Sequence, residues 1–113
     1  MSQITTHVLD TAIGRPAAGV DVTLSRKARD GWQDIASGRT DADGRVADLL
    51  GADCRLDAGV YRMQFATGAY LEGRDATPFY PCVDVVFVLE PGGEHYHIPL
   101  LLSPFGYSTY RGS

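Results

Sequence analysis

The segment Val20-Asp21-Val22-Thr23-Leu24-Ser25 alternates apolar and polar residues without interruption. A period of two is typical of a β-strand that buries one face and exposes the other. Seven further segments show this alternation or are rich in β-branched and aromatic residues, namely Ile4–Leu9, Trp32–Gly38, Arg45–Leu49, Gly59–Phe65, Cys82–Leu89, His95–Leu101 and Tyr107–Arg111. The pattern therefore predicts an all-β chain.

Turn residues separate the predicted strands, and one segment favours a helix. Glycine, proline and aspartate gather at Gly14-Arg15-Pro16, Asp41-Ala42-Asp43-Gly44 and Pro91-Gly92-Gly93, where we expect the chain to reverse. The segment Ala66–Arg74 can form a short helix that stops at Gly73. Eight short strands with one helical turn predict an antiparallel sandwich, built as a single domain over residues 1–113.

Composition and charge exclude several classes of protein. The chain has 113 residues, 44% of them hydrophobic and 21% charged, as in an ordinary globular domain. A net charge of −4 opposes binding to nucleic acid, and the longest apolar run, Val85–Leu89, is too short to cross a membrane. No basic and apolar leader precedes Ile4, and two cysteines, Cys54 and Cys82, are too few for a disulfide scaffold. We expect a cytoplasmic protein with two free thiols.

Three histidines are the most informative polar residues. His95 and His97 lie two positions apart in a predicted strand, so both side chains leave the same face of the sheet. Tyr96 leaves the opposite face and is expected to enter the core. His7 lies in the first predicted strand and shares a face with Thr5.

These histidines allow a metal interpretation and a structural one. Two imidazoles on one strand face can chelate Zn²⁺, but a catalytic zinc usually has three protein ligands, and His7 is the third only if the strands meet. The alternative is a pair of polar histidines on a sheet surface. The segment Asp41-Ala42-Asp43-Gly44 lacks the later ligands of a calcium loop and is predicted to be a hairpin turn. We expect no metal and no cofactor.

Five motifs together resemble one enzyme family. They are Thr6-His7-Val8-Leu9-Asp10, Gly14-Arg15-Pro16-Ala17, Thr40–Arg45, His97–Phe105 and the closing Tyr110-Arg111-Gly112-Ser113. In these motifs the chain resembles the 5-hydroxyisourate hydrolases, the transthyretin-related enzymes of urate breakdown. The likeness runs from Ile4 to Ser113, and the closing tetrapeptide separates the hydrolases from the hormone-carrying transthyretins.

The resemblance implies a fold, an assembly and a reaction. The fold is a transthyretin-like Greek-key sandwich of two four-stranded antiparallel sheets with one short helix. The assembly is a homotetramer, a dimer of dimers with active sites where the dimers meet. The reaction is the hydrolysis of 5-hydroxyisourate to 2-oxo-4-hydroxy-4-carboxy-5-ureidoimidazoline in purine degradation. The implied catalytic residues are His7, Arg45, His97 and Ser113, and the implied substrate-binding residues are His7, Arg45, Tyr110, Arg111, Gly112 and Ser113. His95 lies outside the set.

The residue types suit this chemistry. Water is a poor nucleophile at neutral pH, and an imidazole is well matched to remove its proton. Either His7 or His97 can be that base, with the other histidine orienting it or returning the proton to the leaving nitrogen. The guanidinium of Arg45 can stabilise negative charge on the attacked carbonyl oxygen or hold an imide edge through two hydrogen bonds. Hydroxyls of Tyr110 and Ser113 suit the remaining polar edges of the substrate.

Two other functions fit a β-sandwich of this size. One is a carrier of a small aromatic ligand without turnover, whose pocket is expected to be mainly apolar. The histidines, the arginine and the polar tail disfavour it. The other is an extracellular adhesion or carbohydrate-binding module, which the missing leader and the cysteine count disfavour.

Overall fold

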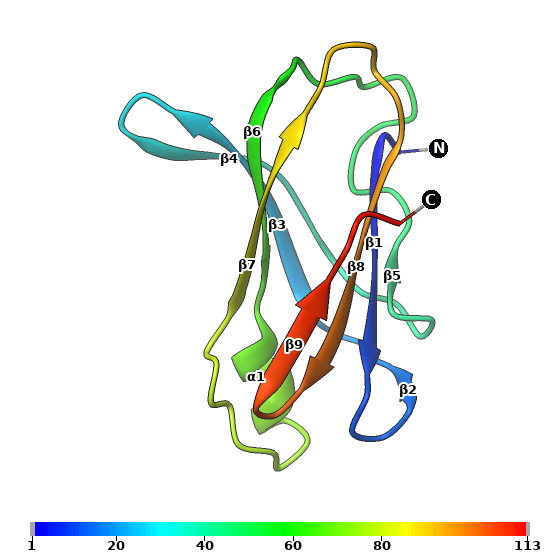
Figure 1. Ribbon diagram of the computed structural model, residues 1–113. Coiled ribbons are helices and arrows are strands. Elements are labelled where there is room, and N and C mark those ends of the chain that lie inside the picture. Colours follow the sequence, from blue (N-terminus) through cyan, green and yellow to red (C-terminus); the bar gives the residue numbers. More distant parts are fainter. Residues whose placement is uncertain (1, 113) are drawn as a thin grey trace.

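Two β-sheets pack face to face in the computed structural model, which describes residues 2–112 (Figure 1). These residues form the strands β1 (Ile4–Asp10), β2 (Arg15–Pro16), β3 (Asp21–Ala28), β4 (Gly31–Arg39), β5 (Arg45–Val46), β6 (Gly59–Phe65), β7 (Val83–Leu89), β8 (Tyr96–Ser103) and β9 (Gly106–Thr109), and the helix α1 (Thr67–Glu72). One sheet has the order β2-β1-β8-β9, with β5 also paired to β1, and the other has the order β4-β3-β6-β7. The predicted sandwich with one short helix is confirmed.

The first sheet requires a correction to the prediction of four antiparallel strands per sheet. It has five strands, and β1 runs parallel to β8. Strands joined by a tight hairpin must be antiparallel, whereas β1 and β8 are separated by the whole second sheet and are free of that constraint. The extra strand is the two-residue β2, which lies within a predicted turn, and the predicted strand Arg45–Leu49 shortens to β5.

Period-two burial places the histidine face of the first sheet outward. Along β1 the even-numbered side chains are buried, and Thr5, His7 and Leu9 between them are half-buried. On β8, Tyr96 and Ile98 are buried in the core, and His97 between them is half-buried on the other face. The expected orientation of these side chains is confirmed, and the first sheet carries its histidines on the face that points away from the core.

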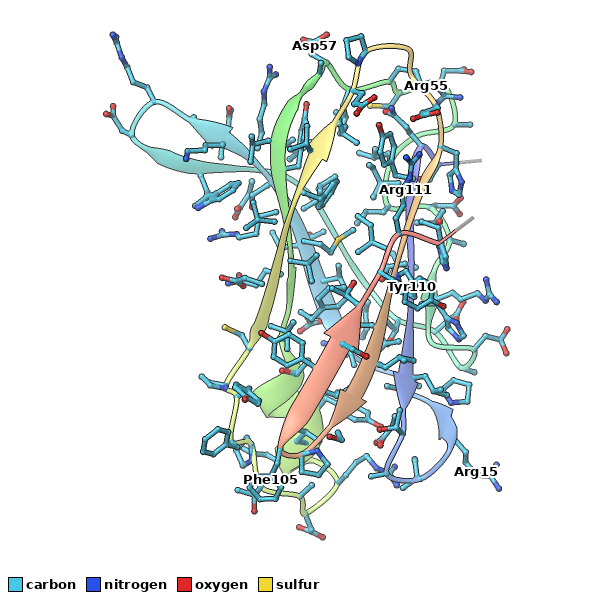
Figure 2. The ribbon with its side chains drawn as sticks, viewed as in Figure 1. Arg15, Arg55, Asp57, Phe105, Tyr110 and Arg111 are labelled. Carbon is cyan, nitrogen blue, oxygen red and sulfur yellow. The ribbon has the colours of Figure 1, made fainter. Side chains whose placement is uncertain are left out.

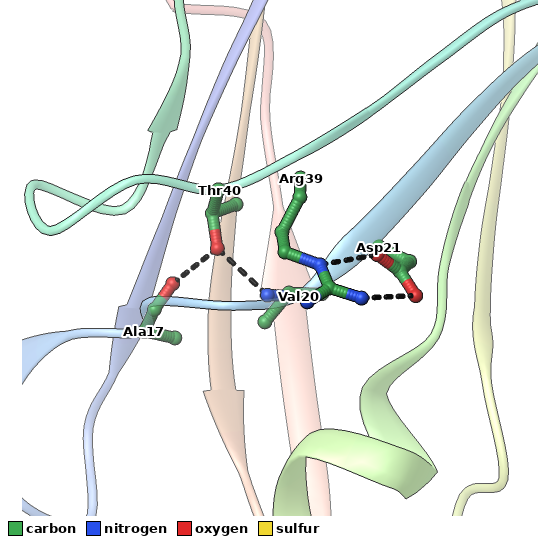
Figure 3. A network of polar contacts seen from close by, with 5 residues as sticks. All are labelled: Ala17, Val20, Asp21, Arg39 and Thr40. Carbon is green, nitrogen blue, oxygen red and sulfur yellow. Dashed lines mark hydrogen bonds and ion pairs between the residues drawn. The ribbon is translucent and has the colours of Figure 1, made fainter.

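Thr40 anchors the connection from β4 to β5 (Figure 3). Its hydroxyl donates to the carbonyl of Ala17 at 2.7 Å and accepts from the N–H of Val20 at 2.8 Å. The residue is buried, and loss of one such buried partner typically costs about 1–3 kcal/mol. The neighbouring ion pair of Arg39 and Asp21, at 2.8 Å, lowers the pKa of Asp21 but is exposed and contributes little to stability. Thr40 therefore fixes the start of the turn that leads to Arg45.

Two further features bear on the cellular setting. Cys54 and Cys82 are both free thiols. The helix found within residues 2–112 has six residues, and nothing helical in that range has the length and apolar character needed to cross a bilayer.

Candidate active site

A cavity of about 400 Å³ opens on the outward face of the first sheet. Its volume lies in the range of small-molecule sites. The lining comes from β1, the turn before β5, β5 with the residue after it, and β8 with the residue before it. It consists of Thr5, Thr6, Asp41, Arg45, Val46, Ala47, His95 and His97. Two of the residues predicted for the site, Arg45 and His97, therefore meet here, together with His95.

The turn before β5 holds the backbone of Arg45 in place. The side-chain oxygen Oδ1 of Asp41 accepts the N–H of Asp43 at 2.8 Å and the N–H of Arg45 at 3.1 Å, and the N–H of Asp41 donates to the carbonyl of Arg45 at 2.9 Å. Gly44 has a φ of 75°, and a Cβ there would lie 2.5 Å from the carbonyl oxygen of Val8. The segment is a closed turn, as predicted.

The guanidinium of Arg45 is free to meet a ligand. Arg45 is exposed, lines the cavity and pairs through its backbone with His7 on β1. Within residues 2–112 its side chain takes part in none of the ion pairs or hydrogen bonds. A planar cation with no partner inside the described chain is well suited to hold an oxygen-rich substrate.

Thr5 lies between the two histidines of the cavity. Its Oγ1 is 2.8 Å from Nδ1 of His97 and 2.9 Å from Nε2 of His95. The imidazole rings lie nearly parallel, at an angle of 18° with centroids 6.5 Å apart. The parallel register of β1 and β8 places Thr5 directly beside His97. Since Thr5 occupies Nδ1 of His97, Nε2 is the nitrogen left for a substrate.

The surroundings of His97 favour its neutral form. Burial lowers the pKa of His97 first, and the positive charges of Arg45, His95 and His7 lower it further. A histidine with a pKa below its usual value is uncharged at neutral pH and can accept a proton.

His7 lies near the cavity but outside its lining. It is half-buried on β1, on the same face as Thr5. In the backbone pairing of the strands, His7 lies opposite Arg45 of β5 and opposite Pro99 of β8. Its charge acts on the pKa of His97. The structure thus brings His7 to the edge of the site.

The residues of the C-terminal segment lie in two places, because Gly112 contacts His97 whereas Tyr110 and Arg111 line a second cavity. The N–H of Gly112 donates to the carbonyl of His97 at 2.8 Å, and a Cβ on Gly112 would lie 2.6 Å from Cδ2 of that imidazole. Only a glycine therefore allows this close approach. Ser113 lies outside the described residues.

Tyr110 and Arg111 do not line the histidine cavity of their own chain. Both line a second cavity of about 280 Å³ that also contacts β7 and Tyr96. The guanidinium of Arg111 lies 4.1 Å above the ring of Tyr96 and 3.1 Å from a carboxylate oxygen of Glu94. Figure 2 shows both side chains on the last segment of the chain, with Arg111 nearer the end of the molecule that carries Arg55.

Sequence reasoning left Thr5 and His95 out of the site. Both have the signal of sharing a strand face with a predicted site histidine, since Thr5 is two positions from His7 and His95 two from His97. Between residues 2 and 112, no group of three or more histidine, cysteine or acidic side chains is arranged to hold a metal ion.

Comparison with known sequences gives consistent matches over nearly the whole chain. The model of the HIUase/Transthyretin family matches residues 4–112. The 5-hydroxyisourate hydrolase of Salmonella dublin is 44% identical over 110 residues, which cover 97% of this chain and 80% of that protein. The 5-hydroxyisourate hydrolase of Mus musculus is 43% identical over 114 residues, which cover 99% of this chain and 96% of that protein.

Comparison with solved structures gives two kinds of neighbour. Sea bream transthyretin in complex with thyroxine superposes with a TM-score of 0.91 at 41% identity, covering 98% of this chain and 95% of that one. The 5-hydroxyisourate hydrolase of Klebsiella pneumoniae superposes with a TM-score of 0.85 at 38% identity, covering 97% of this chain and 98% of that one. The fold is therefore shared by a hormone-binding protein and an enzyme, and the residues of the site must distinguish the two functions.

Proposed function

The chain belongs to the HIUase/transthyretin family, and from this premise we propose that it hydrolyses 5-hydroxyisourate. One observation favours a hydrolase over a ligand carrier. A single cavity presents the guanidinium of Arg45, whose side chain has no partner within residues 2–112, and the imidazole of His97, whose pKa is lowered by burial and by the charges of Arg45, His95 and His7. A cation for an oxyanion beside a neutral base is what addition of water to a carbonyl requires.

The mechanism follows from the free atoms of these side chains. Nε2 of His97 removes a proton from water as the water oxygen bonds to a ring carbonyl carbon, and Arg45 stabilises the negative charge that develops on the carbonyl oxygen. The ring carbon–nitrogen bond then breaks, and the leaving nitrogen takes a proton from the histidine pair, in which His7 is the second member. The product carries a carboxylate where the ring was closed.

We assign the C-terminal residues a place in substrate binding through a second copy of the chain. Gly112 contacts His97 within the same chain, whereas Tyr110 and Arg111 face another cavity and Tyr110 is 59% exposed. In a homotetramer with sites where two dimers meet, side chains of a neighbouring copy complete each cavity, together with Ser113. Light scattering on the active protein should give the mass of four chains, and a fully active monomer would contradict this assignment.

A cytoplasmic location is part of the same proposal. Free thiols at Cys54 and Cys82 fit a reducing compartment, where cysteines stay unpaired.

The carrier hypothesis is the second candidate, and the thyroxine complex of the sea bream neighbour favours it. The discriminating experiment follows the ultraviolet absorbance of freshly generated 5-hydroxyisourate with and without the protein. We expect decay to accelerate in proportion to protein concentration. A carrier binds without turnover, so an unchanged decay rate would reject the enzyme assignment.

The lowered pKa of His97 predicts how activity depends on pH. Protonation of His97 removes the base, so kcat/KM should be high above the ordinary histidine pKa of about 6.5 and should fall only at lower pH. Burial and the charges of Arg45, His95 and His7 favour the neutral form of His97, while its hydrogen bond with Thr5 acts in the opposite direction. Initial rates between pH 5 and pH 8 measure this fall of kcat/KM on the acid side of the pH profile, its acid limb. A midpoint clearly above the ordinary histidine value would show that His97 is not the base.

A further inference from the structure

Thr5 connects the proposed base to a histidine that the mechanism leaves unused. Its hydroxyl lies 2.8 Å from Nδ1 of His97 and 2.9 Å from Nε2 of His95, so three side chains form one continuous hydrogen-bonded chain. His97 is half-buried at one end of it, and His95 is exposed at the other. These three side chains therefore lie along the wall of one cavity and run from the half-buried His97 to His95, which lines the same cavity and is exposed to solvent.

Only one direction of hydrogen bonding suits a base at His97. A hydroxyl has one hydrogen, so Thr5 donates to one imidazole and accepts from the other. If Thr5 donates to His95, then Nδ1 of His97 carries the hydrogen that Thr5 accepts, and Nε2 of His97 keeps a free lone pair. If the direction is reversed, Nε2 of His97 carries the hydrogen and cannot accept another.

The reaction also produces a proton that must leave the cavity. Hydrolysis of a ring amide yields an N–H group and a carboxylic acid, and a carboxylic acid with a pKa near 4 is ionised at neutral pH. One proton is therefore released in each turnover. Arg45 and His7 disfavour a lasting positive charge on His97, which drives this proton away from the cavity.

We propose that Thr5 and His95 form a relay that carries this proton from His97 to solvent, an inference that rests on the proposed hydrolysis. Nε2 of His97 takes up the proton, and Nδ1 of His97 passes its own hydrogen to Oγ1 of Thr5. Thr5 passes its hydroxyl hydrogen to Nε2 of His95, and the exposed His95 releases the hydrogen on its Nδ1 to water. After the product leaves, water gives a hydrogen to Nδ1 of His95, Nε2 of His95 returns its hydrogen to Thr5, and Thr5 returns its own to Nδ1 of His97. Nε2 of His97 then releases its hydrogen to water in the emptied cavity, which restores the starting arrangement.

The kinetic test removes the relay at two places. Thr5→Val deletes the hydroxyl at nearly constant shape, and His95→Gln keeps a hydrogen-bonding group that cannot take up a proton. Each should lower kcat by about tenfold to a hundredfold, a part of what general acid–base catalysis provides, with little change in KM. The double variant should be no slower than the slower single variant, because both changes interrupt one relay. Thr5→Ser should restore kcat to within a few-fold of the starting protein.

The control is Thr23→Val, which alters a half-buried threonine of β3 in the other sheet and should leave kcat unchanged. If Thr5→Val does not fold, His95→Gln carries the test, since that side chain is exposed. Unchanged kcat in His95→Gln, losses confined to KM, or additive losses in the double variant would overturn the relay. Failure of the unaltered protein to accelerate decay would instead reject the proposed function.

A second measurement is independent of turnover. Nitrogen NMR of the imidazoles near pH 8 should find the hydrogen on Nδ1 in both His97 and His95, as the proposed direction requires. Thr5→Val should reduce the influence of His95 protonation on the nitrogen shifts of His97 to the through-space effect of its charge. A hydrogen on Nε2 of neutral His97 would overturn the relay whether or not the protein is an enzyme.

Discussion

Replacing His97 with asparagine should lower kcat/KM for 5-hydroxyisourate by about 10²–10⁴-fold, the usual contribution of a general base. The asparagine amide can still hydrogen-bond Thr5 in place of Nδ1, and the backbone pairing of β1 with β8 does not involve the side chain that is changed. The group that is lost is Nε2, the imidazole nitrogen that we propose as the base. Initial rates of absorbance decay, measured at pH 7.5 and corrected for spontaneous hydrolysis, give the ratio directly.

The companion change is His7→Asn, which separates the two histidines. His7 lies at the edge of the cavity and is assigned the return of a proton to the leaving nitrogen, so its loss should lower kcat and leave the acid limb of the pH profile in place. His97→Asn should abolish that limb. Near-normal turnover in both variants, with unchanged melting temperatures, would refute the acid–base mechanism.

Strand periodicity was sufficient to predict which side chains leave the outward face. The alternation around His95 and His97 placed Tyr96 in the core and both imidazoles outside, as found. The same rule applied to β1 gave the face of Thr5 and His7. These predictions succeeded because side-chain direction in a strand depends only on position parity.

The contact of Thr5 with two histidines could not be derived in this way. It depends on the register of β1 against β8, which are about 90 residues apart in the chain and pair in parallel. Hairpin turns fix the register of neighbouring strands, but no local signal fixes it for strands brought together by the whole topology. The packing of both sheets determines the register of β1 against β8.

Local sequence patterns were equally unable to predict the path of the C-terminal segment. Strand β9 ends at Thr109, and the chain then crosses to pair Gly112 with His97. Arg111 turns instead to the ring of Tyr96 and to Glu94, and these contacts join residues from different elements. The resemblance grouped all four terminal residues into one site, whereas the single chain brings one described member, Gly112, into contact with His97.

Replacing Arg45 with lysine should lower kcat/KM by about 10²-fold, the magnitude typical for loss of one oxyanion-stabilising donor. The substitution retains the positive charge, so the general electrostatic attraction of the cavity is nearly unchanged. The planar pair of N–H groups that can hold two oxygens at once is lost, and an ammonium is a single point of charge. Steady-state kinetics of decay, with circular dichroism to check the fold, measure the effect.

Arg39→Lys is the matched control for this change. Arg39 is exposed on β4 and pairs with Asp21 of the adjacent strand β3, and both lie in the sheet that does not carry the cavity. The same chemical substitution there should leave kcat/KM unaltered. The backbone of Arg45 is held by Asp41 and by its pairing with His7, which means that Arg45→Lys alters the tip of the side chain and not the turn. Equal activity of the two lysine variants would show that charge alone is needed at Arg45 and would remove the two-point contact from the mechanism. A loss confined to Arg45→Lys would assign the geometry of the guanidinium, beyond its charge, a direct part in the reaction.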